Sequence, residues 1–438
     1  MAIETSQRIS VRRIKALRLS SLLHRGAWGL GDQAFISATN FVTTVVLARA
    51  LGPASYGAFA LVYAAIFFAS ALQSALVTRP HNVIGATYSG ADYRRYSSAT
   101  AMSQIWLIGV LALIVSIAAL LAHGATWSIA PLLLPLLPAI IAWQLQEFFR
   151  RVLYTEGRLK LAFLNDVVSY GAQAIGIIAL AHYGRLTGAR ALYIVALTSA
   201  VAAVLGLWMI RESLDRREMG HPTRGQWLAE NWRFGKWIFA AIVVAASSSQ
   251  LYTALIGGLV SVAEAGVFRA LITIFGPARI LLTAMETSLT PAAARVFAEK
   301  GQPGLHSFIV RVMAITAPIM AAYGILVSLF ATPILGTLLG DQYRQYGWLL
   351  ALLALSYVLM YLLSPVVIAL EGRRISAPVF YAGLWSGAIG LTVGIAAIHL
   401  FGLLGAVLGM ILDLLISNTI LWRRYRRIAA TTMPEAIQ

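Results

Sequence analysis

The chain is a succession of apolar runs, most of them about twenty residues long, separated by short polar segments,. A helix of about 20 residues rises about 30 Å, which matches the hydrocarbon core of a bilayer. Hydrophobic residues make up 59% of the chain and charged residues 12%, a balance that a soluble fold could not bury. The pattern predicts an all-α, polytopic integral membrane protein with twelve transmembrane helices, at residues 26–49, 57–78, 99–121, 129–149, 161–182, 190–210, 234–256, 265–289, 309–331, 346–369, 376–398 and 402–422.

The basic residues indicate which way these spans run. The net charge of +17 comes from 34 lysines and arginines against 17 acidic residues. Nearly all of the basic residues fall in alternate connections and in the two terminal segments, and the opposite side holds only Arg49, Arg185, Arg190 and Arg344. Because lysine and arginine are retained on the cytoplasmic side, we expect both termini in the cytoplasm. The high charge then encodes orientation and not nucleic-acid binding.

Short motifs recur at a spacing of about half the chain. TEGR at residues 155–158 returns as LEGR at 370–373, and LGPASYGAF at 51–59 has a looser counterpart, VSVAEAGVF, at 260–268. A repeat of this length in a membrane protein predicts two six-helix lobes around a central cavity. The expected order is a basic N-terminal segment, an N-lobe, a cytoplasmic linker, a C-lobe and a cytoplasmic tail, at residues 1–25, 26–210, 211–233, 234–422 and 423–438. Residues 8–23 are expected to form an interfacial amphipathic helix or a disordered tail.

A family resemblance rests on motifs near the ends of several spans. The first span begins GLGDQ and runs into VVLARALGPASYGAFALVYA at residues 45–64, Arg79-Pro80 opens the next connection, and EGR triplets precede spans 5 and 11. Over residues 25–425 the chain resembles the polysaccharide transporter family of the multidrug/oligosaccharidyl-lipid/polysaccharide exporter superfamily.

The resemblance implies a function as well as a fold. It implies a flippase of the bacterial inner membrane that moves a polyprenyl-diphosphate-linked oligosaccharide to the outer leaflet by alternating access. The product would be O-antigen, capsule or exopolysaccharide. The implied partners are the lipid-linked oligosaccharide, membrane lipid, and the polysaccharide polymerase and chain-length machinery.

Two arginines lie inside the eighth predicted span, where a charge is costly and marks a functional site by default. Arginine can grip a phosphate through two parallel hydrogen bonds and stays protonated. We therefore expect Arg279, and with it Arg269, to face the cavity and bind the substrate diphosphate. The alternatives are a structural ion pair of Arg279 with Glu286 or Asp413, and an Arg269 side chain that extends to the outer surface. Gly276-Pro277 is expected to kink this helix.

Arg49 and Arg79 lie where the first two spans end. Each is interpreted either as an anchor of the topology or as part of a basic cavity rim that contacts the substrate.

Carboxylates within the spans are candidate sites for a coupling ion. Asp32 lies about one third into the first span, Glu286 in the eighth and Asp413 near the middle of the last,. Each could hold a proton or a sodium ion, and a buried, hydrogen-bonded or ion-paired carboxylate is the alternative. Glu147 and Asp166 are expected to form interfacial salt bridges with neighbouring arginines. No cofactor or metal is expected, since the chain has no cysteine and its seven histidines show no metal-binding spacing,.

Three alternatives to a flippase stay open. A cation-coupled multidrug exporter of the same superfamily would use Asp32, although intramembrane arginines would repel a cationic drug. A twelve-span facilitator would carry a Gly/Asp/Arg-rich loop where this chain reads RPHNVIGATYSGADYRRY. A membrane polymerase or ligase would need a large outer loop and a catalytic set that the sequence lacks. With no P-loop either, we expect a transporter that is not an enzyme.

Overall fold

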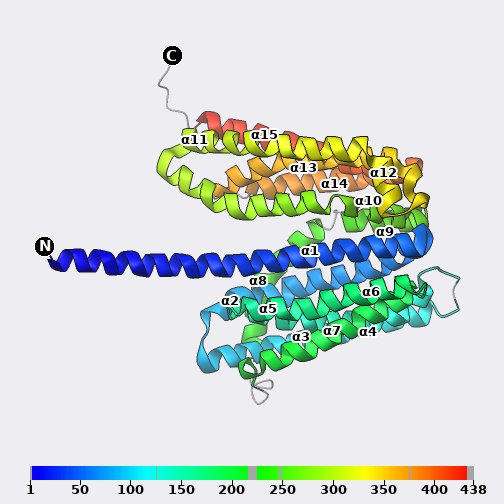
Figure 1. Cartoon of the computed structure of the whole chain (residues 1–438), viewed down its shortest axis with the longest axis horizontal. Coiled ribbons are helices and arrows are strands. Elements are labelled where there is room, and N and C mark those ends of the chain that lie inside the picture. Colours follow the sequence, from blue (N-terminus) through cyan, green and yellow to red (C-terminus); the bar gives the residue numbers. More distant parts are fainter. Residues whose placement is uncertain are drawn as a thin grey trace.

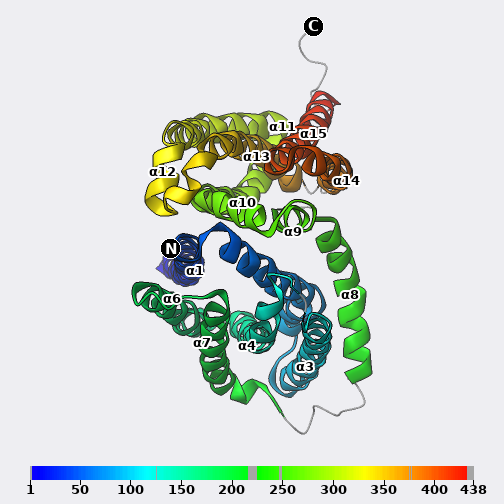
Figure 2. The same ribbon diagram turned by 90° about the vertical axis from the view of Figure 1, so that its right-hand side faces the viewer.

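The computed structural model describes residues 2–124, 126–215, 224–245, 249–373, 375 and 377–431. These residues form helices and the turns that join them, with no strand among them, so the all-α prediction is confirmed. Two helical bundles lie side by side, an N-lobe of α1–α7 and a C-lobe of α9–α15, and α8 runs between them (Figures 1 and 2).

The N-lobe helices correspond to the first six predicted spans. The first helix contains the first two spans and extends back through the basic N-terminal segment. The N-lobe elements are α1 (Ala2–Gln73), a π-helical turn (Ser74–Thr78), α2 (Arg79–Ile84), a 3₁₀ turn (Gly85–Thr87), α3 (Gly90–Leu121), α4 (Ala130–Thr155), α5 (Leu159–Asp166), a second π-helical turn (Val167–Gly171), α6 (Ala172–His182), α7 (Gly188–Met209) and a 3₁₀ turn (Arg211–Ser213).

The C-lobe follows the same plan with more breaks. Its seventh and eighth predicted spans are each divided between two helices. The elements are α8 (Arg224–Ala245), α9 (Ser249–Leu259), α10 (Val262–Ile274), α11 (Gly276–Leu329), α12 (Ala331–Leu338), a 3₁₀ turn (Asp341–Tyr346), α13 (Gly347–Gly372), α14 (Ala377–Phe401) and α15 (Leu403–Thr431).

Nine stretches of the described residues are long and apolar enough to cross a membrane. Two of them, of 57 and 54 residues, each contain two predicted spans joined through a sharp bend. The span predicted at 234–256 includes residues outside the described ranges. The nine stretches are thus consistent with twelve crossings. The beginning of α1 and the end of α15 lie at the same end of the molecule (Figure 1), called the terminal end below, and the opposite end is called the far end.

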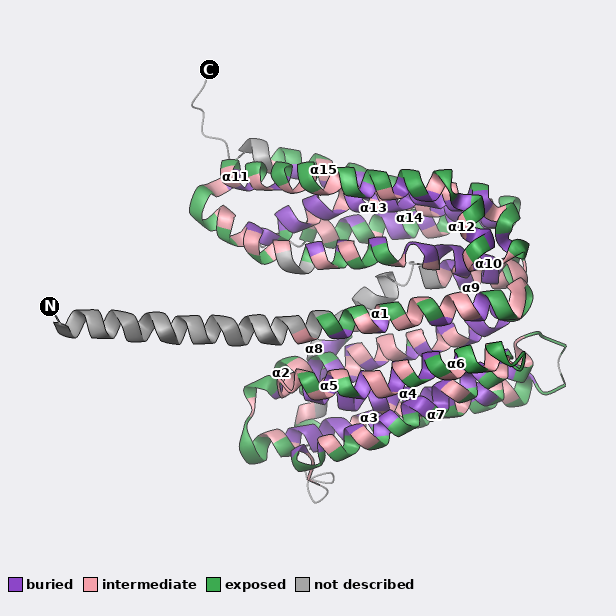
Figure 3. Ribbon diagram, viewed as in Figure 1, coloured by how far each residue is buried: buried purple, intermediate pink, exposed green. Residues whose placement is uncertain are grey.

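The outer faces of both lobes are rich in exposed residues (Figure 3), and many of the exposed residues are large and apolar. Leu120 of α3, Leu134 of α4, Val204 of α7 and Leu329 of α11 are each more than 60% exposed. A soluble monomer rarely exposes contiguous apolar surface on this scale, whereas lipid tails solvate it without penalty. The chain is a multi-pass membrane protein.

A glycine with positive φ divides α1 into two membrane-spanning halves. Gly52 has φ 72° and ψ 168°, a conformation that a residue with a Cβ atom rarely adopts. In the C-lobe the corresponding bend lies between α9 and α10, where the hydroxyl of Ser261 accepts a hydrogen bond of 3.1 Å from the backbone N–H of Glu264,. The repeated segments 51–59 and 260–268 therefore occupy equivalent positions in the two lobes.

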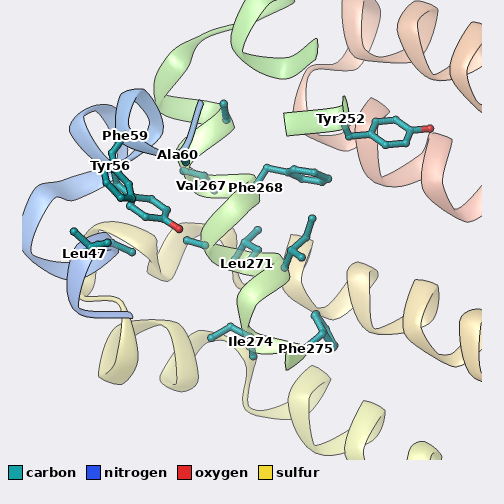
Figure 4. Close-up of a cluster of buried hydrophobic side chains, with 14 of the residues drawn as sticks. Leu47, Tyr56, Phe59, Ala60, Tyr252, Val267, Phe268, Leu271, Ile274 and Phe275 are labelled. Atoms are coloured by element: carbon teal, nitrogen blue, oxygen red, sulfur yellow. The ribbon is translucent and has the colours of Figure 1, made fainter. Parts of the chain in front are cut away.

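These repeated segments also contact each other. A Cβ atom added to Gly57 would lie 1.8 Å from the carbonyl oxygen of Val262, and one added to Gly266 would lie 2.3 Å from that of Pro53. Only glycine allows α1 and α10 to cross so closely. Apolar side chains of both helices pack around the crossing (Figure 4), in a buried cluster that spans the two lobes.

The beginning of α8 packs against the N-lobe, although α8 leads into the C-lobe. The hydroxyl of Tyr96 donates to Asn231 Oδ1 at 2.8 Å. A Cβ atom added to Gly235 would lie 2.4 Å from the carbonyl oxygen of Ala75. The connection between the lobes is thus held by side-chain and backbone contacts on its N-lobe side.

Candidate functional site

A cavity of about 900 Å³ lies between the lobes and is called the central cavity. Its N-lobe wall comes from α1 and from Gln173 of α6, and its C-lobe wall comes from α10, the first turns of α11 and Tyr357 of α13. It extends along α1 from Gln33, on the side of the terminal end, to Leu47 near the bend. This volume is within the range of sites that enclose an organic ligand.

A break between α10 and α11 shapes the C-lobe wall. The α10 helix ends at Ile274 and α11 begins at Gly276-Pro277, which confirms the kink expected from this pair. Proline has no N–H to offer the preceding turn, and the hydroxyl of Tyr323 donates to the carbonyl of Ile274 at 2.7 Å. Phe275 stacks on Tyr357 with ring centroids 4.2 Å apart. The break is therefore fixed by packing and hydrogen bonding.

The structure brings the two predicted arginines together in the central cavity. Arg269 and Arg279 both line it, on either side of the α10–α11 break, and both interact electrostatically with Tyr357. The guanidinium carbon of Arg269 lies 5.6 Å from the centre of the Phe67 ring, and this side chain also interacts electrostatically with Tyr56. Arg279 is exposed to the cavity. Arg269 is thus held by aromatic groups of the opposite lobe.

No carboxylate in the described ranges lies within ion-pairing distance of either arginine. The two carboxylates considered as partners of Arg279 are engaged elsewhere. Glu286 accepts a hydrogen bond of 2.9 Å from Ser364, and Asp413 packs against Gly390 of α14. Neither of these carboxylates lines the central cavity.

The other two predicted arginines do not line the central cavity. Arg49 lies at the far end, where its Nη1 donates to the carbonyl of Thr337 at 2.8 Å and so joins α1 to α12. Arg79 is the exposed first residue of α2. The contact of Arg49 is between lobes and suits a residue that closes the far end of the cavity.

Asp32 lies in a buried charge cluster, defined as Asp32, Glu147, Arg150 and Asp166. The Arg150 guanidinium contacts Asp32 Oδ2 at 3.0 Å, Glu147 Oε2 at 3.0 Å and Asp166 Oδ2 at 2.5 Å. Tyr154 also donates its hydroxyl to Asp32. The ion pairs of Glu147 and Asp166 were expected from the sequence, and the inclusion of Asp32 matches its interpretation as an ion-paired carboxylate. Its coupling role stays a prediction.

The buried charge cluster has more carboxylates than guanidinium groups to neutralise them. Glu147 also contacts Arg151 at 2.6 Å, so three carboxylates share two guanidinium groups. Asp32 Oδ1 is buried and has no hydrogen-bond partner among the described residues. With one negative charge in excess, the cluster is suited to hold a cation or a proton. It lies directly behind the cavity wall, since Asp32 precedes the lining residue Gln33.

The sequence did not identify the aromatic and amide residues of the N-lobe wall. Phe59, Tyr63 and Phe67 project from the second half of α1 at spacings of four residues and line the cavity with Gln173 and Thr43. Residues four apart share one face of a helix. This spacing was the available signal, but which neighbour the face contacts depends on the packing of the lobes.

Comparisons with known proteins agree with this architecture. Residues 46–348 match the profile of a family described as polysaccharide biosynthesis protein. No curated protein matches the sequence. Among solved structures, an inward-facing multidrug resistance MATE family transporter of the MOP superfamily is 15% identical, with a TM-score of 0.74 over 90% of this chain and 95% of that chain.

Two further structures share the fold at similar identity. The lipid II flippase MurJ in an inward closed conformation is 15% identical, with a TM-score of 0.66 over 92% of this chain and 87% of that one. An outward-facing MATE transporter is also 15% identical, with a TM-score of 0.62 over 92% and 94% of the two chains. These likenesses show the fold shared by transporters and flippases of the superfamily.

The family match runs from within the first span to the beginning of the tenth, which is more than half of the chain. The fold likeness covers nearly all of it. The chain belongs to the family described as polysaccharide biosynthesis protein, and it has the fold seen in MATE transporters and in MurJ.

Proposed function

We propose that this protein moves a polyprenyl-diphosphate-linked oligosaccharide across the bacterial inner membrane by alternating access, for the synthesis of O-antigen, capsule or exopolysaccharide. It acts as a transporter and not as an enzyme. The family supports a role in polysaccharide biosynthesis, and the fold is similar to that of a lipid II flippase.

The observation that carries the proposal is the pair of arginines in the central cavity. A charge inside the membrane is costly unless something compensates it, and neither Arg269 nor Arg279 has a carboxylate partner in the described part of the chain. A diphosphate supplies two negatively charged groups, each able to accept paired hydrogen bonds from a guanidinium. The two arginines would therefore bind the charged headgroup while the polyprenyl tail stays in lipid.

The direction of loading follows from the closed end of the cavity. Three hydrogen bonds join the lobes at the far end: Arg49 to Thr337, Tyr343 to Ala48, and Gln342 to Arg49. The lining residues extend from there toward the terminal end. With both termini in the cytoplasm, as the distribution of basic residues predicts, substrate enters from the cytoplasmic leaflet.

The buried charge cluster is our candidate for ion coupling. Protonation of one carboxylate in the cluster would remove the excess negative charge and weaken a contact between α1 and α4. We propose a proton as the coupling ion, with sodium as the alternative. Glu286 and Asp413 are the corresponding candidates in the C-lobe, where Asp413 Oδ1 is also buried without a partner among the described residues.

A cation-coupled multidrug exporter is the second candidate function. The similarity to a MATE transporter with a TM-score of 0.74 favours it, as does a buried carboxylate in the first span. The cavity lining opposes it, because two arginines and no described carboxylate line the central cavity, and a cationic drug would be repelled.

The test is the sidedness of the lipid-linked oligosaccharide in cells with and without this protein. A membrane-impermeant reagent that modifies sugars reports the fraction in the outer leaflet. We expect the intermediate to accumulate on the cytoplasmic side when the protein is absent. Unchanged sidedness and polymer yield would exclude the flippase and direct attention to Asp32 and drug export.

Substitution of Arg279 tests the site within the same assay. Arg279→Ala is expected to abolish flipping, and Arg279→Lys to retain part of it, because lysine keeps the charge but loses the paired hydrogen bonds. Arg190→Ala is the matched control, because Arg190 is an exposed arginine in the first turn of α7, and it should flip normally. Normal flipping by Arg279→Ala would contradict the assignment of the diphosphate site.

A further inference from the structure

The two walls of the central cavity differ in their polar groups. Both arginines belong to the C-lobe wall, whereas the N-lobe wall has only apolar, aromatic, amide and hydroxyl side chains. A diphosphate accounts for the arginines. It does not account for the neutral polar groups on the opposite wall, because neutral amides and hydroxyls are better matched to neutral hydroxyl groups of a ligand.

Two of these neutral groups are buried without a hydrogen-bond partner. Thr43 is 5% exposed and Gln173 is 2% exposed, yet Thr43 Oγ1 and Gln173 Oε1 have no partner among the described residues. Buried polar groups are normally paired, since an unpaired one destabilises the fold. Both residues line the central cavity, so a ligand there is positioned to pair with them.

The hydroxyl of Thr43 differs from those of neighbouring threonines in its hydrogen bonding. Thr39 on the same helix donates to the carbonyl of Phe35 at 2.9 Å, and Thr273 on the C-lobe wall donates to that of Arg269 at 3.0 Å. This hydrogen bond to the preceding turn is the usual arrangement for threonine in a helix. Thr43 does not make it, so its hydroxyl is left without a partner in a residue that lines the cavity.

Gln173 lies beside a row of aromatic rings. The rings of Phe59 and Tyr63 stack at 5.2 Å with an interplanar angle of 18°, and Tyr63 meets Phe67 edge to face at 5.4 Å. The side chain of Gln173 lies beside the hydroxyl of Tyr63. An aromatic face beside an unpaired amide oxygen complements a pyranose ring, which has a face of C–H groups and a rim of hydroxyl donors.

This row of rings leads directly to the proposed diphosphate site. The guanidinium of Arg269 lies over Phe67, which contacts Tyr63, which contacts Gln173. Only the ring of Phe67 therefore separates Tyr63 from Arg269. A sugar bonded to the diphosphate would lie against this part of the wall.

We propose that Thr43, Tyr63 and Gln173 form a sugar subsite on the N-lobe wall that recognises the first sugar of the lipid-linked oligosaccharide. The inference rests on the proposed function and extends it. The C-lobe arginines bind the diphosphate common to all such lipids, and the N-lobe wall selects the sugar attached to it. Sugar selectivity and headgroup affinity then depend on different lobes.

Binding to purified full-length protein tests this division. The probes are farnesyl diphosphate and its conjugates with glucose, galactose and N-acetylglucosamine, measured as quenching of tryptophan fluorescence. Wild type should bind at least one conjugate more tightly than farnesyl diphosphate. Gln173→Met removes the amide while keeping a similar length, so it should weaken the best conjugate about tenfold and leave farnesyl diphosphate within about twofold. Arg279→Ala should weaken all four probes.

A second variant guards against effects of folding. Thr43→Val replaces the unpaired hydroxyl with a methyl group and should reduce the sugar preference in the same way. Thr198→Val is its control, because Thr198 is a buried threonine of α7 outside the cavity whose hydroxyl already donates to Ile194 at 2.9 Å. It should bind every probe as wild type does.

The outcomes separate this inference from the function on which it rests. If wild type prefers no conjugate, or if Gln173→Met and Thr43→Val change all four probes equally, the sugar subsite is wrong. The diphosphate site stands in that case, provided that Arg279→Ala still loses binding. If wild type binds none of the probes, both the subsite and the proposed function fail.

Discussion

At the scale of single residues, the surroundings of an arginine separate a structural role from a ligand-binding one. Arg150 is 6% exposed and contacts three carboxylates, whereas Arg269 and Arg279 contact none within the described ranges. A guanidinium surrounded by carboxylates is neutralised and attracts no further anion. One without a counter-ion keeps its positive field in the cavity, where a low dielectric strengthens it.

Arg150→Ala is expected to destabilise the N-lobe severely. The substitution leaves three carboxylates of the charge cluster close together in the protein interior with Arg151 as the remaining counter-ion. Loss of one partner from a buried ion pair costs about 3–5 kcal/mol. The melting temperature of the purified protein in detergent, followed by tryptophan fluorescence, should fall by many degrees, or the variant should fail to accumulate.

The neighbouring arginine provides the control for this prediction. Arg151 also contacts Glu147, but its side chain is 39% exposed. Arg151→Ala should cost no more than about 1 kcal/mol. Similar losses from the two variants would mean that burial of the cluster does not govern its energy.

The sequence indicated some of these residues and not others, for a physical reason. Arg269 and Arg279 interrupt an apolar run, and that interruption is visible without a structure. Arg49 and Arg79 lie at the ends of the first two apolar spans, so their contacts depend on the bends that follow those spans. Gln173 gave no signal, because an amide within a span becomes informative only when its neighbours on other helices are known.

At the scale of helices, span lengths were predictable and breaks were largely not. Bilayer thickness sets the length of each apolar run, so the predicted spans agree with the helices of the structure. The bend at Gly276-Pro277 was predicted, and Gly52 lies in the gap between the first two predicted spans. The π-helical turns at Ser74–Thr78 and Val167–Gly171 were not, because such turns depend on tertiary contacts and on side chains of neighbouring helices.

Gly57→Ala is expected to separate the lobes at the far end. Its Cβ atom would lie 1.8 Å from the carbonyl oxygen of Val262, a rigid backbone atom, so α1 and α10 must move apart. The chain has no cysteine, which allows a single probe at Ala48→Cys, where the native residue is fully buried at the closed end. A maleimide should label this cysteine faster in the Gly57→Ala background than with Gly57 intact.

Gly109→Ala is the matched control for this crossing. Gly109 lies on α3, and a Cβ atom there would meet nothing within 4 Å. Labelling at Ala48→Cys should be unaffected by it. Equal labelling rates in the Gly57→Ala and Gly109→Ala backgrounds would show that the close crossing does not hold the far end closed.

At the scale of the whole molecule, the duplicated architecture places its conformational contacts between the lobes. The glycine crossing lies at the junction of the two repeats, and the three far-end hydrogen bonds all run from α1 to α12 or to the turn that follows it. Alternating access in the proposed function requires these contacts to break while each lobe keeps its own core. The lobes could be expected from the repeat, but their contacts could not, since the repeat specifies each lobe and not the surface between them.

Removal of two far-end contacts should shift the protein toward the opposite conformation. Arg49→Ala removes the bond to Thr337, and Tyr343→Phe removes the bond from the buried Tyr343 hydroxyl to the carbonyl of Ala48, 3.2 Å long. Each bond contributes about 0.5–1.5 kcal/mol, so the double variant should raise the population open at the far end roughly fivefold or more.

Spin labels at Arg185→Cys and Gln345→Cys, exposed positions on opposite lobes, report this population as a second, longer distance by double electron–electron resonance. Arg344→Ala loses an ion pair within its own turn and a packing contact with Gly336 of α12, both inside the C-lobe, and should keep the wild-type distances. If the double variant also keeps them, the far end is held by apolar packing around the glycine crossing and not by its hydrogen bonds.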